Sequence, residues 1–311
     1  MSALLRVLAA AVGALPWRSL RVLGAALGWI AGTALRIRRR HVEHAMREAG
    51  IVDAGAEVNA MYRSLGTSAF EFLHLASNGV CATMHAHVDP ASRDLWWAAL
   101  ERGSGIVIAA SHTGNWDLAA CAVAREVELL VVTKRLRVRA LDAFWQKARA
   151  AQGIRLSNAV GVIARARTVL GRGGAVAMMI DQVPMSSRHA VAAEFLGRRA
   201  LIDRGPAALA AACRAPLVVA ASRREASGEH VLVVLDVIVP PHRPSRSWII
   251  DATAAATRAL DRFVRAHPSQ WLWLHRRWKV LDRAPRRTTL DASCPQRSTR
   301  SSSPTAASRA A

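Results

Sequence analysis

The spacing of apolar positions along the chain changes at about residue 104. Before it, residues 56–78 place apolar side chains at helical spacing, which predicts an amphipathic helix. After it, short β-branched runs predict strands at Ile106–Ala110, Leu129–Thr133, Ala175–Ile180, Leu217–Ala221 and Val231–Val239. Helical stretches at 114–126, 139–152, 160–172 and 203–214 separate the first four strands, and a last helix is expected at Ser247–Ala266. This alternation predicts an α/β fold, a mixed central sheet flanked by helices.

The amino-terminal 42 residues carry seven arginines and no acidic residue. Two apolar stretches, Ala3–Leu15 and Val22–Leu35, are separated by Pro16. The second is 14 residues long, about 21 Å of helix, whereas a span needs about 20 residues. We expect 1–42 to be a hydrophobic anchor on the inner leaflet, with the Arg36–Arg40 cluster on the cytoplasmic side. The alternatives are a signal peptide and a buried hairpin of the main domain.

The rest of the chain divides into a body at 43–283 and a tail at 284–311, in which Ser, Thr, Arg, Ala and Pro predict disorder. With 52% hydrophobic residues in 311, the chain as a whole is not disordered. Lys and Arg number 43 against 22 acidic residues, a net charge of +21. This charge indicates a polyanionic partner: nucleic acid, an anionic membrane surface or an acidic carrier.

The four cysteines, at 81, 121, 213 and 294, form no CxxC pair, and the eleven histidines include no HExxH. The sequence therefore predicts free thiols, no metal site and no disulfide framework.

The most informative segment is residues 105–124, where an apolar strand ends at Ser111 and a helix follows. His112 and Asp117 are five positions apart, about 140° on a straight helix, so the two meet only if a turn at Gly114 intervenes. We expect Asn115 to cap the helix and Asp117 to orient His112 as a general base. The alternative is a structural histidine paired with a helix aspartate. No GxSxG motif supplies a nucleophile, so the base would activate a substrate hydroxyl.

The string SHTGNWD resembles the H-x4-D/E signature of glycerolipid and lipid A acyltransferases, and more narrowly the bacterial lipid A biosynthesis lauroyl/myristoyl acyltransferase family. Further blocks resemble that family in the same order across residues 4–283: DQVP at 181–184, EFLGRRA at 194–200, RGPAALA at 204–210, RAPLVV at 214–219 and HPSQWLWLHRRWK at 267–279.

The resemblance implies transfer of a fatty acyl group from an acyl carrier protein or coenzyme A thioester to a hydroxyl of a lipid A precursor or related glycolipid. The reaction would need no cofactor and would take place at the cytoplasmic face of the cell inner membrane. A lysophospholipid or an amino-lipid is the alternative acceptor. Two other classes are a nucleic-acid-binding protein, for which the chain has no recognition motif, and an inactive scaffold of the same fold.

The other expected site residues bind substrate, and Asn115 is expected to do so in addition to capping the helix. The resemblance implies that Lys134, with Arg135 beside it, takes the place of the family's basic residue after the second strand. Asp181 and Gln182 end a buried strand, which makes them site candidates. The remaining candidates are Arg149 and Arg204 for anionic headgroups and Gly197 for a tight turn near the acyl pocket. Trp271, Trp273 and Trp278 suggest either an interfacial belt or packed core.

Overall fold

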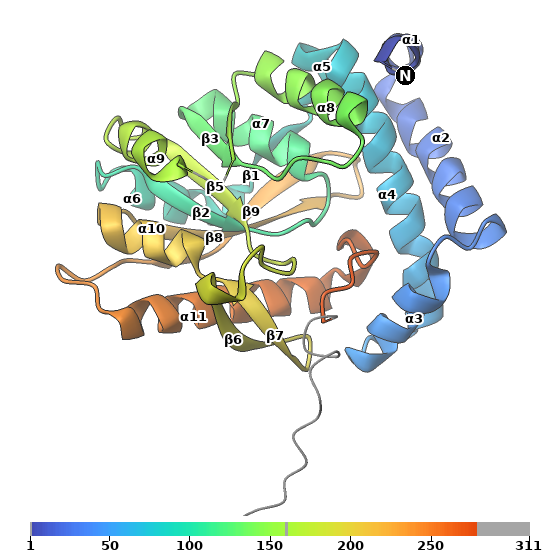
Figure 1. The fold of residues 1–311 in the computed structure, drawn as a ribbon. Coiled ribbons are helices and arrows are strands. Elements are labelled where there is room, and N and C mark those ends of the chain that lie inside the picture. Colours follow the sequence, from blue (N-terminus) through green and yellow to red (C-terminus); the bar gives the residue numbers. More distant parts are fainter. Residues whose placement is uncertain (1, 159–160, 279–311) are drawn as a thin grey trace, which may run out of the picture.

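The computed structural model describes residues 2–158 and 161–278, and its centre is a mixed β-sheet (Figure 1). Within these residues the sheet has seven strands in the order β1-β9-β8-β2-β5-β3-β4. Five of them, β2, β3, β4, β5 and β8, run parallel to one another, whereas β9 is antiparallel to β8 and parallel to β1. The strands are β1 Ala86–Val88, β2 Ile106–Ala110, β3 Leu129–Val132, β4 Arg155–Ser157, β5 Ala175–Met179, β8 Leu217–Arg224 and β9 His230–Ile238.

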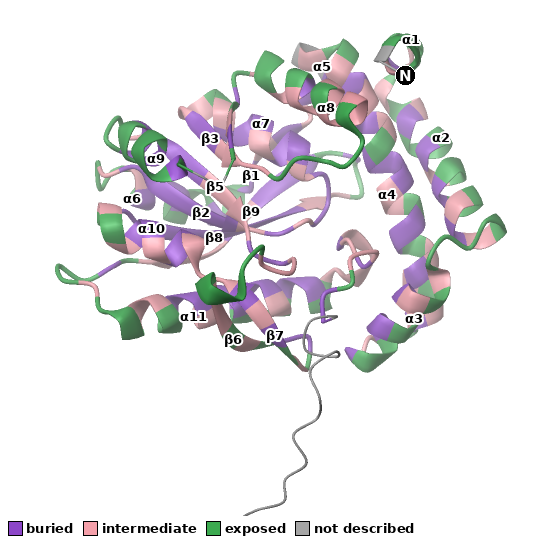
Figure 2. Ribbon diagram, viewed as in Figure 1, coloured by how far each residue is buried: buried purple, intermediate pink, exposed green. Residues whose placement is uncertain are grey.

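Both faces of the sheet are covered, which explains why its central strands are continuously apolar. Along β2, Val107 and Ala109 belong to one core cluster, and Ile106 and Ile108 belong to the other. Successive side chains of a strand point to opposite faces, so one strand supplies both cores. Figure 2 shows buried residues concentrated in the sheet and on the helix faces turned towards it.

The first core lies under α9 (Val162–Leu170), α10 (Gly205–Cys213) and α11 (Arg246–Ala266). The second lies under α6 (Arg93–Leu100), α7 (Trp116–Glu126) and α8 (Arg139–Ala151). The α/β architecture and the five predicted strands are confirmed within one or two residues, except that β8 continues three residues further. The structure adds the short edge strands β1 and β4, whose three residues are too few to show a period in the sequence.

A two-stranded antiparallel hairpin, β6 (Ala190–Phe195) and β7 (Arg198–Asp203), packs beside α11. Its turn places Leu196 at φ 54° and Gly197 at φ 74°, so the tight turn expected at Gly197 is present. The hairpin itself was not predicted because most β6 side chains are partly or fully exposed, which removes the apolar alternation that marks a strand.

The amino-terminal helices pack on one another beside the sheet, with α2 on the outer side of α4 (Figure 1). Gly28 of α2 touches the α4 backbone so closely that an added Cβ would lie 2.0 Å from the Tyr62 carbonyl oxygen. Glycine is therefore required there for the two backbones to meet. The elements are α1 Ser2–Gly13, α2 Trp17–Trp29, the π-helix η1 Ile30–Ala34, α3 Arg39–Glu48, α4 Ala54–Ser77 and α5 Gly79–Thr83, and the short 3-10 turns are η2 Pro90–Ser92, η3 Ser187–His189 and η4 Pro268–Gln270.

The outer side of α1, α2 and η1 exposes large apolar side chains, among them Leu4, Val22 and Trp29. In the described part of the chain, no single helix has both the length and the apolar character that crossing a membrane requires. The segments Trp17–Ala34 and Arg39–Glu48 satisfy both conditions together, but they meet at a 90° bend. The predicted disordered tail, 284–311, lies outside the described residues.

Candidate active site

His112 and Asp181 lie at the carboxyl ends of neighbouring parallel strands. The pairing of β2 with β5 ends at Ala110 opposite Met179. His112 and Asp181 each follow two residues later, so the register of the sheet carries them side by side. This edge of the strands is where α/β sheets place functional side chains.

Asp181 holds the His112 imidazole directly. The ring Nδ1 lies 2.9 Å from Asp181 Oδ1, and the His112 backbone N–H donates to Oδ2 at 2.8 Å. The Trp271 indole N–H donates to the same Oδ2 at 2.8 Å, and the Gln182 amide nitrogen lies 3.3 Å from Nδ1. The Asp181 side chain is 1% exposed and that of His112 is 19% exposed, so the imidazole is the member of this His112–Asp181 dyad that faces outward.

Asp181 is ionised despite its burial. Desolvation alone would raise the pKa of this carboxyl, but the nearby His112 and the hydrogen bonds from His112 and Trp271 outweigh it and lower the pKa to about 2. A buried carboxylate that accepts Nδ1–H leaves the ring's Nε2 as the basic nitrogen.

Asp117, expected to orient His112, instead bonds to α8. Its Oδ1 lies 2.6 Å from Arg149 Nε, and its two oxygens accept the Trp145 indole N–H at 3.3 and 3.1 Å. Asp117 sits in the first turn of α7 and points across to α8, whereas Asp181 comes off β5 beside the histidine. The carboxylate that contacts the His112 ring is therefore that of Asp181.

The histidine loop, residues 111–116, is fixed to the strand and the segment beside it. The Thr113 hydroxyl accepts the backbone N–H of Ser222 on β8 at 3.1 Å, and the Gly114 N–H donates to the Gln270 carbonyl at 2.8 Å. Gly114 has φ 55°, and a Cβ there would lie 2.7 Å from the Ser222 carbonyl oxygen, so the turn requires glycine.

Asn115 caps α7, as predicted: its Oδ1 accepts the Leu118 N–H at 3.2 Å. This is why the helix begins at Trp116 and not at residue 114. Asn115 is only 2% exposed and its amide nitrogen donates to Glu71 of α4 at 3.0 Å. Both ends of its side chain are thus engaged inside the protein, whereas the sequence suggested contact with substrate.

An apolar pocket lies between the sheet and α7, and part of it is open to solvent. Small side chains leave this space: Ala119 and Ala120 on the helix face Ala110 and Ala177 on the sheet. At the end next to the histidine loop the lining includes Ser111, Trp116, Asp117 and Arg149. The Trp116 and His112 ring centroids are 5.1 Å apart, which places the dyad beside this end of the pocket.

A model of the bacterial lipid A biosynthesis acyltransferase family matches residues 2–280. The chain belongs to this family. A comparison with individually curated proteins found no match. Membership makes the chain an acyltransferase that uses an acyl thioester donor and a lipid acceptor, and members of this family are generally membrane-associated.

The basic residue that the acyltransferase places at its pocket is Arg149. Lys134 and Arg135 are exposed on the connection between β3 and α8. In contrast, the Arg149 side chain is 15% exposed, lines the pocket and pairs with Asp117.

Two other candidates form no hydrogen bond or ion pair with His112 or Asp181 among the described residues. Arg204 precedes α10, and its backbone N–H donates to the His189 carbonyl. The Gly197 turn belongs to the β6–β7 hairpin and does not line the pocket, although Phe195, at the end of β6, packs edge-on against Trp271. Among the residues described, no cluster of His, Cys, Asp and Glu is arranged to hold a metal ion.

The carboxy-terminal tryptophans are packed core. Trp271, Trp273 and Trp278 are 2%, 1% and 4% exposed, so an interfacial belt is excluded for them. Beside them Arg277 is 1% exposed, and burial lowers its pKa to about 10. Its guanidinium lies over the Phe195 ring at 5.7 Å and makes no hydrogen bond to any other described residue.

Sequence reasoning missed Trp271 as a partner of the dyad, together with Glu71 and Arg224. Trp271 donates to the dyad from 90 residues away, which no local pattern shows. A signal existed for Glu71, since a lone acid stands between Phe70 and Phe72 in an apolar helix.

Proposed function

We propose that this acyltransferase moves a fatty acyl chain from an acyl carrier protein or coenzyme A thioester to a hydroxyl of a lipid A precursor or related glycolipid. The observation that supports the proposal is the His112–Asp181 dyad beside an apolar pocket.

In this mechanism His112 Nε2 removes the proton of the acceptor hydroxyl as its oxygen attacks the thioester carbonyl carbon. Asp181 holds the proton on Nδ1 and stabilises the imidazolium that forms. When the tetrahedral intermediate collapses, the C–S bond breaks and the sulfur takes the proton from Nε2. The products are an ester and a free thiol, and His112 is again neutral.

The pocket accounts for the acyl chain. Apart from Asp117, Arg149 and two serines, its lining is apolar, so a hydrocarbon tail is desolvated there while the thioester stays near His112. Arg149, with the exposed Lys134 and Arg135, supplies positive charge for phosphate groups of an anionic acceptor or of the donor's carrier arm.

We further propose that the protein binds the cytoplasmic face of the inner membrane through residues 1–42. Leu4, Val22 and Trp29 form part of an exposed apolar surface that arginines such as Arg18 and Arg36 accompany. Apolar insertion combined with attraction to anionic lipid is the mode of interfacial helices. Concentrated salt should therefore release only part of the protein from anionic vesicles, and complete release would contradict insertion.

The decisive experiment follows acyl transfer by mass spectrometry, using acyl carrier protein thioesters and a lipid A precursor in mixed micelles. The His112→Ala variant should bind vesicles like the wild type and transfer no acyl chain. Retained turnover would refute the mechanism. Lipids from a strain lacking the protein identify the acceptor: a missing secondary acyl chain on lipid A supports the proposal, whereas a changed phospholipid or amino-lipid replaces the acceptor.

The pocket assignment has its own test. Ala120→Phe fills the space between α7 and the sheet, so it should shift the preferred donor to a shorter acyl chain. Ala143→Phe, on the exposed side of α8, is the matched control and should leave chain preference unchanged. An unchanged preference in Ala120→Phe would place the acyl chain elsewhere.

A further inference from the structure

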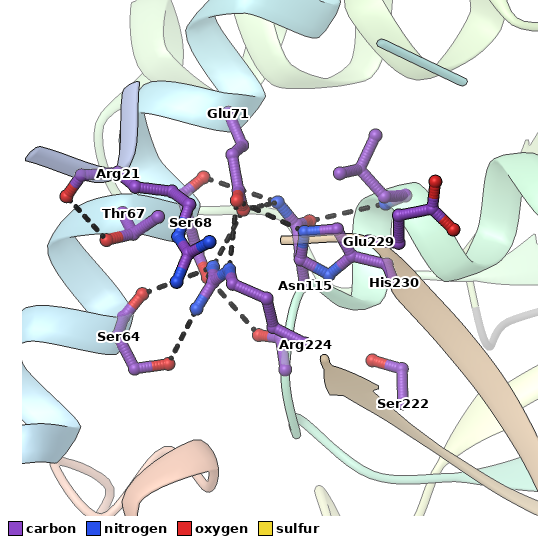
Figure 3. Close-up of polar contacts among 12 residues, drawn as sticks. Arg21, Ser64, Thr67, Ser68, Glu71, Asn115, Ser222, Arg224, Glu229 and His230 are labelled. Carbon is purple, nitrogen blue, oxygen red and sulfur yellow. Dashed lines mark hydrogen bonds and ion pairs between the residues drawn. The ribbon is translucent and has the colours of Figure 1, made fainter. Parts of the chain in front are cut away.

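A buried polar cluster lies behind the histidine loop, centred on Glu71 of α4 (Figure 3). Glu71 and His230 are both 0% exposed, and the Arg224 side chain is 9% exposed. The three come from α4, β9 and β8, and Figure 3 shows them converging with Asn115 on one carboxylate.

The Glu71 carboxylate is fully engaged. Arg224 approaches it with two nitrogens, Nε at 2.9 Å from Oε1 and Nη2 at 2.7 Å from Oε2. Asn115 Nδ2 donates to Oε2 at 3.0 Å, and His230 Nε2 lies 3.1 Å from Oε1, at ion-pair distance. Burial alone would raise the pKa of Glu71, but His230 and Arg224 outweigh it and hold the pKa far below its usual range. The carboxylate is therefore charged at all working pH values.

Arg224 extends the same cluster along α4. Its Nη1 donates to the Ser64 hydroxyl at 3.0 Å and its Nη2 to the Ser68 hydroxyl at 2.9 Å. The Gln270 side chain bonds both the N–H and the carbonyl of Arg224, at 2.6 and 3.1 Å. The Gln270 carbonyl in turn accepts the Gly114 N–H, so the cluster reaches the histidine loop by a second route.

Asn115 links this cluster to the dyad. It stands three residues after His112 and directly before Trp116, whose ring packs edge-on against the imidazole. Its oxygen fixes the start of α7 and its amide nitrogen is fixed by Glu71. If the bond from Glu71 is lost, the turn between the imidazole and Trp116 loses its support from α4.

We propose that Glu71 is a positioning residue for the reaction, because it holds Asn115 and so fixes the histidine loop at the distance from Asp181 that the dyad needs. This inference rests on the proposed role of His112. A fully buried ion pair contributes little net stability compared with apolar packing, since desolvating the charges offsets their attraction. The ion pair instead holds Asn115, and with it the histidine loop, in one position. A misplacement of about 1 Å at a reacting group costs about 10²-fold in rate.

The test is Glu71→Gln in the full-length protein, with steady-state kinetics corrected for the folded fraction. We expect kcat to fall about 10²-fold, while KM for donor and acceptor stays at the wild-type value because Glu71 has no exposed surface. A purely structural role would lower the melting temperature and leave kcat per folded molecule unchanged, and that result would overturn the inference.

Glu225→Gln is the matched control. Glu225 also binds an arginine through two nitrogens, with Arg223 Nε at 2.8 Å and Nη2 at 2.7 Å, but its side chain is 38% exposed. It should keep the wild-type kcat. A fall equal to that of Glu71→Gln would show a general effect of removing an ion pair and would refute the specific role.

Asn115→Ser provides the second variant if Glu71→Gln does not fold. Serine keeps the helix cap but lacks the amide donor to Glu71, so it should show the same kcat loss. In the double variant the losses should not add: a total of about 10²-fold supports one shared contact, and about 10⁴-fold refutes it.

His112→Ala distinguishes an error in the proposed base from an error in the positioning role of Glu71. If that variant retains turnover, the proposed base is wrong. If it is inactive while Glu71→Gln has the wild-type kcat, only the positioning role is wrong.

Discussion

Replacing Asp181 by asparagine tests the dyad with almost no change in volume. The carboxylate accepts three hydrogen bonds: from His112 Nδ1 at 2.9 Å, from the His112 backbone N–H at 2.8 Å and from Trp271 at 2.8 Å. Asparagine has a single acceptor oxygen. If that oxygen stays at the Oδ2 position, it keeps the backbone and tryptophan donors, and the amide NH2 then faces Nδ1. The imidazole must accept there, which puts its proton on Nε2.

The expected cost follows from this change of tautomer. A histidine protonated on Nε2 cannot take the proton of the acceptor, and the equivalent change in a serine protease triad lowers kcat by about 10⁴-fold. That factor corresponds to about 5 kcal/mol of activation free energy. KM should be unaffected because the Asp181 side chain is 1% exposed and has no surface to offer a substrate. Folding should lose about 1–3 kcal/mol, the usual range for a buried group left without its partner.

Asp117→Asn, measured in the same acyl-transfer assay across pH, is the matched comparison. It removes the charge that pairs with Arg149 but keeps an acceptor for Trp145. We expect it to raise KM and to keep the ionisation of the base visible in the pH profile of kcat/KM, whereas Asp181→Asn should lose that ionisation. The reverse pattern, with Asp181→Asn at wild-type kcat and Asp117→Asn lacking the ionisation, would refute the assignment of Asp181 and restore the pairing expected from the sequence.

The remaining predictions concern packing and titration. Gly28→Ala should destabilise the protein by about 1–3 kcal/mol in thermal unfolding, because the added Cβ would meet the Tyr62 backbone. Gly55→Ala is the control, since no atom lies nearer than 3.9 Å to its added Cβ, and it should be neutral or stabilising. Equal effects of the two substitutions would contradict the close helix contact. Because its pKa is lowered in the folded state, Asp181 contributes about 2 kcal/mol to the free energy of unfolding. This contribution is present above pH 3.8 and is lost as the pH falls to about 2. Denaturant titrations at these pH values should show no such loss in Asp181→Asn. Burial raises the pKa of the Cys121 thiol to about 12, so an alkylating reagent should label Cys121 only after unfolding. Labelling of Cys121 itself in the folded protein would contradict its burial.

The sequence predicts the sheet well and the partner of the histidine poorly, for a physical reason. Strands such as Ile106–Ala110 are buried on both faces, and their continuous apolar runs are visible locally. The choice between Asp117 and Asp181 depends on which strands are neighbours. The β2–β5 pairing, which decides it, joins residues 69 positions apart.

Other contacts that the sequence does not show have the same cause. Lys134 was expected to contact the substrate, but it is exposed on the connection between β3 and α8. The basic side chain that lines the pocket between α7 and the sheet is Arg149, from the last turn of α8. Asn115 was correctly predicted as a cap, since capping is a local interaction. Its bond to Glu71 spans 44 residues and needs α4 to pack across the end of the sheet.

The segment from Pro268 to Trp273 has a consequence for the order in which the enzyme becomes active during synthesis. It supplies the indole donor to Asp181 and the carbonyl that accepts the Gly114 N–H. A ribosome delivers this segment after every strand of the sheet, so a nascent chain already carries both members of the dyad while the segment that closes around them is still inside the exit tunnel. Chains interrupted before Gln270 would accordingly lack the contacts that hold His112 and Asp181 in place, and we expect acyl transfer to begin only after residues 268–273 have left the tunnel.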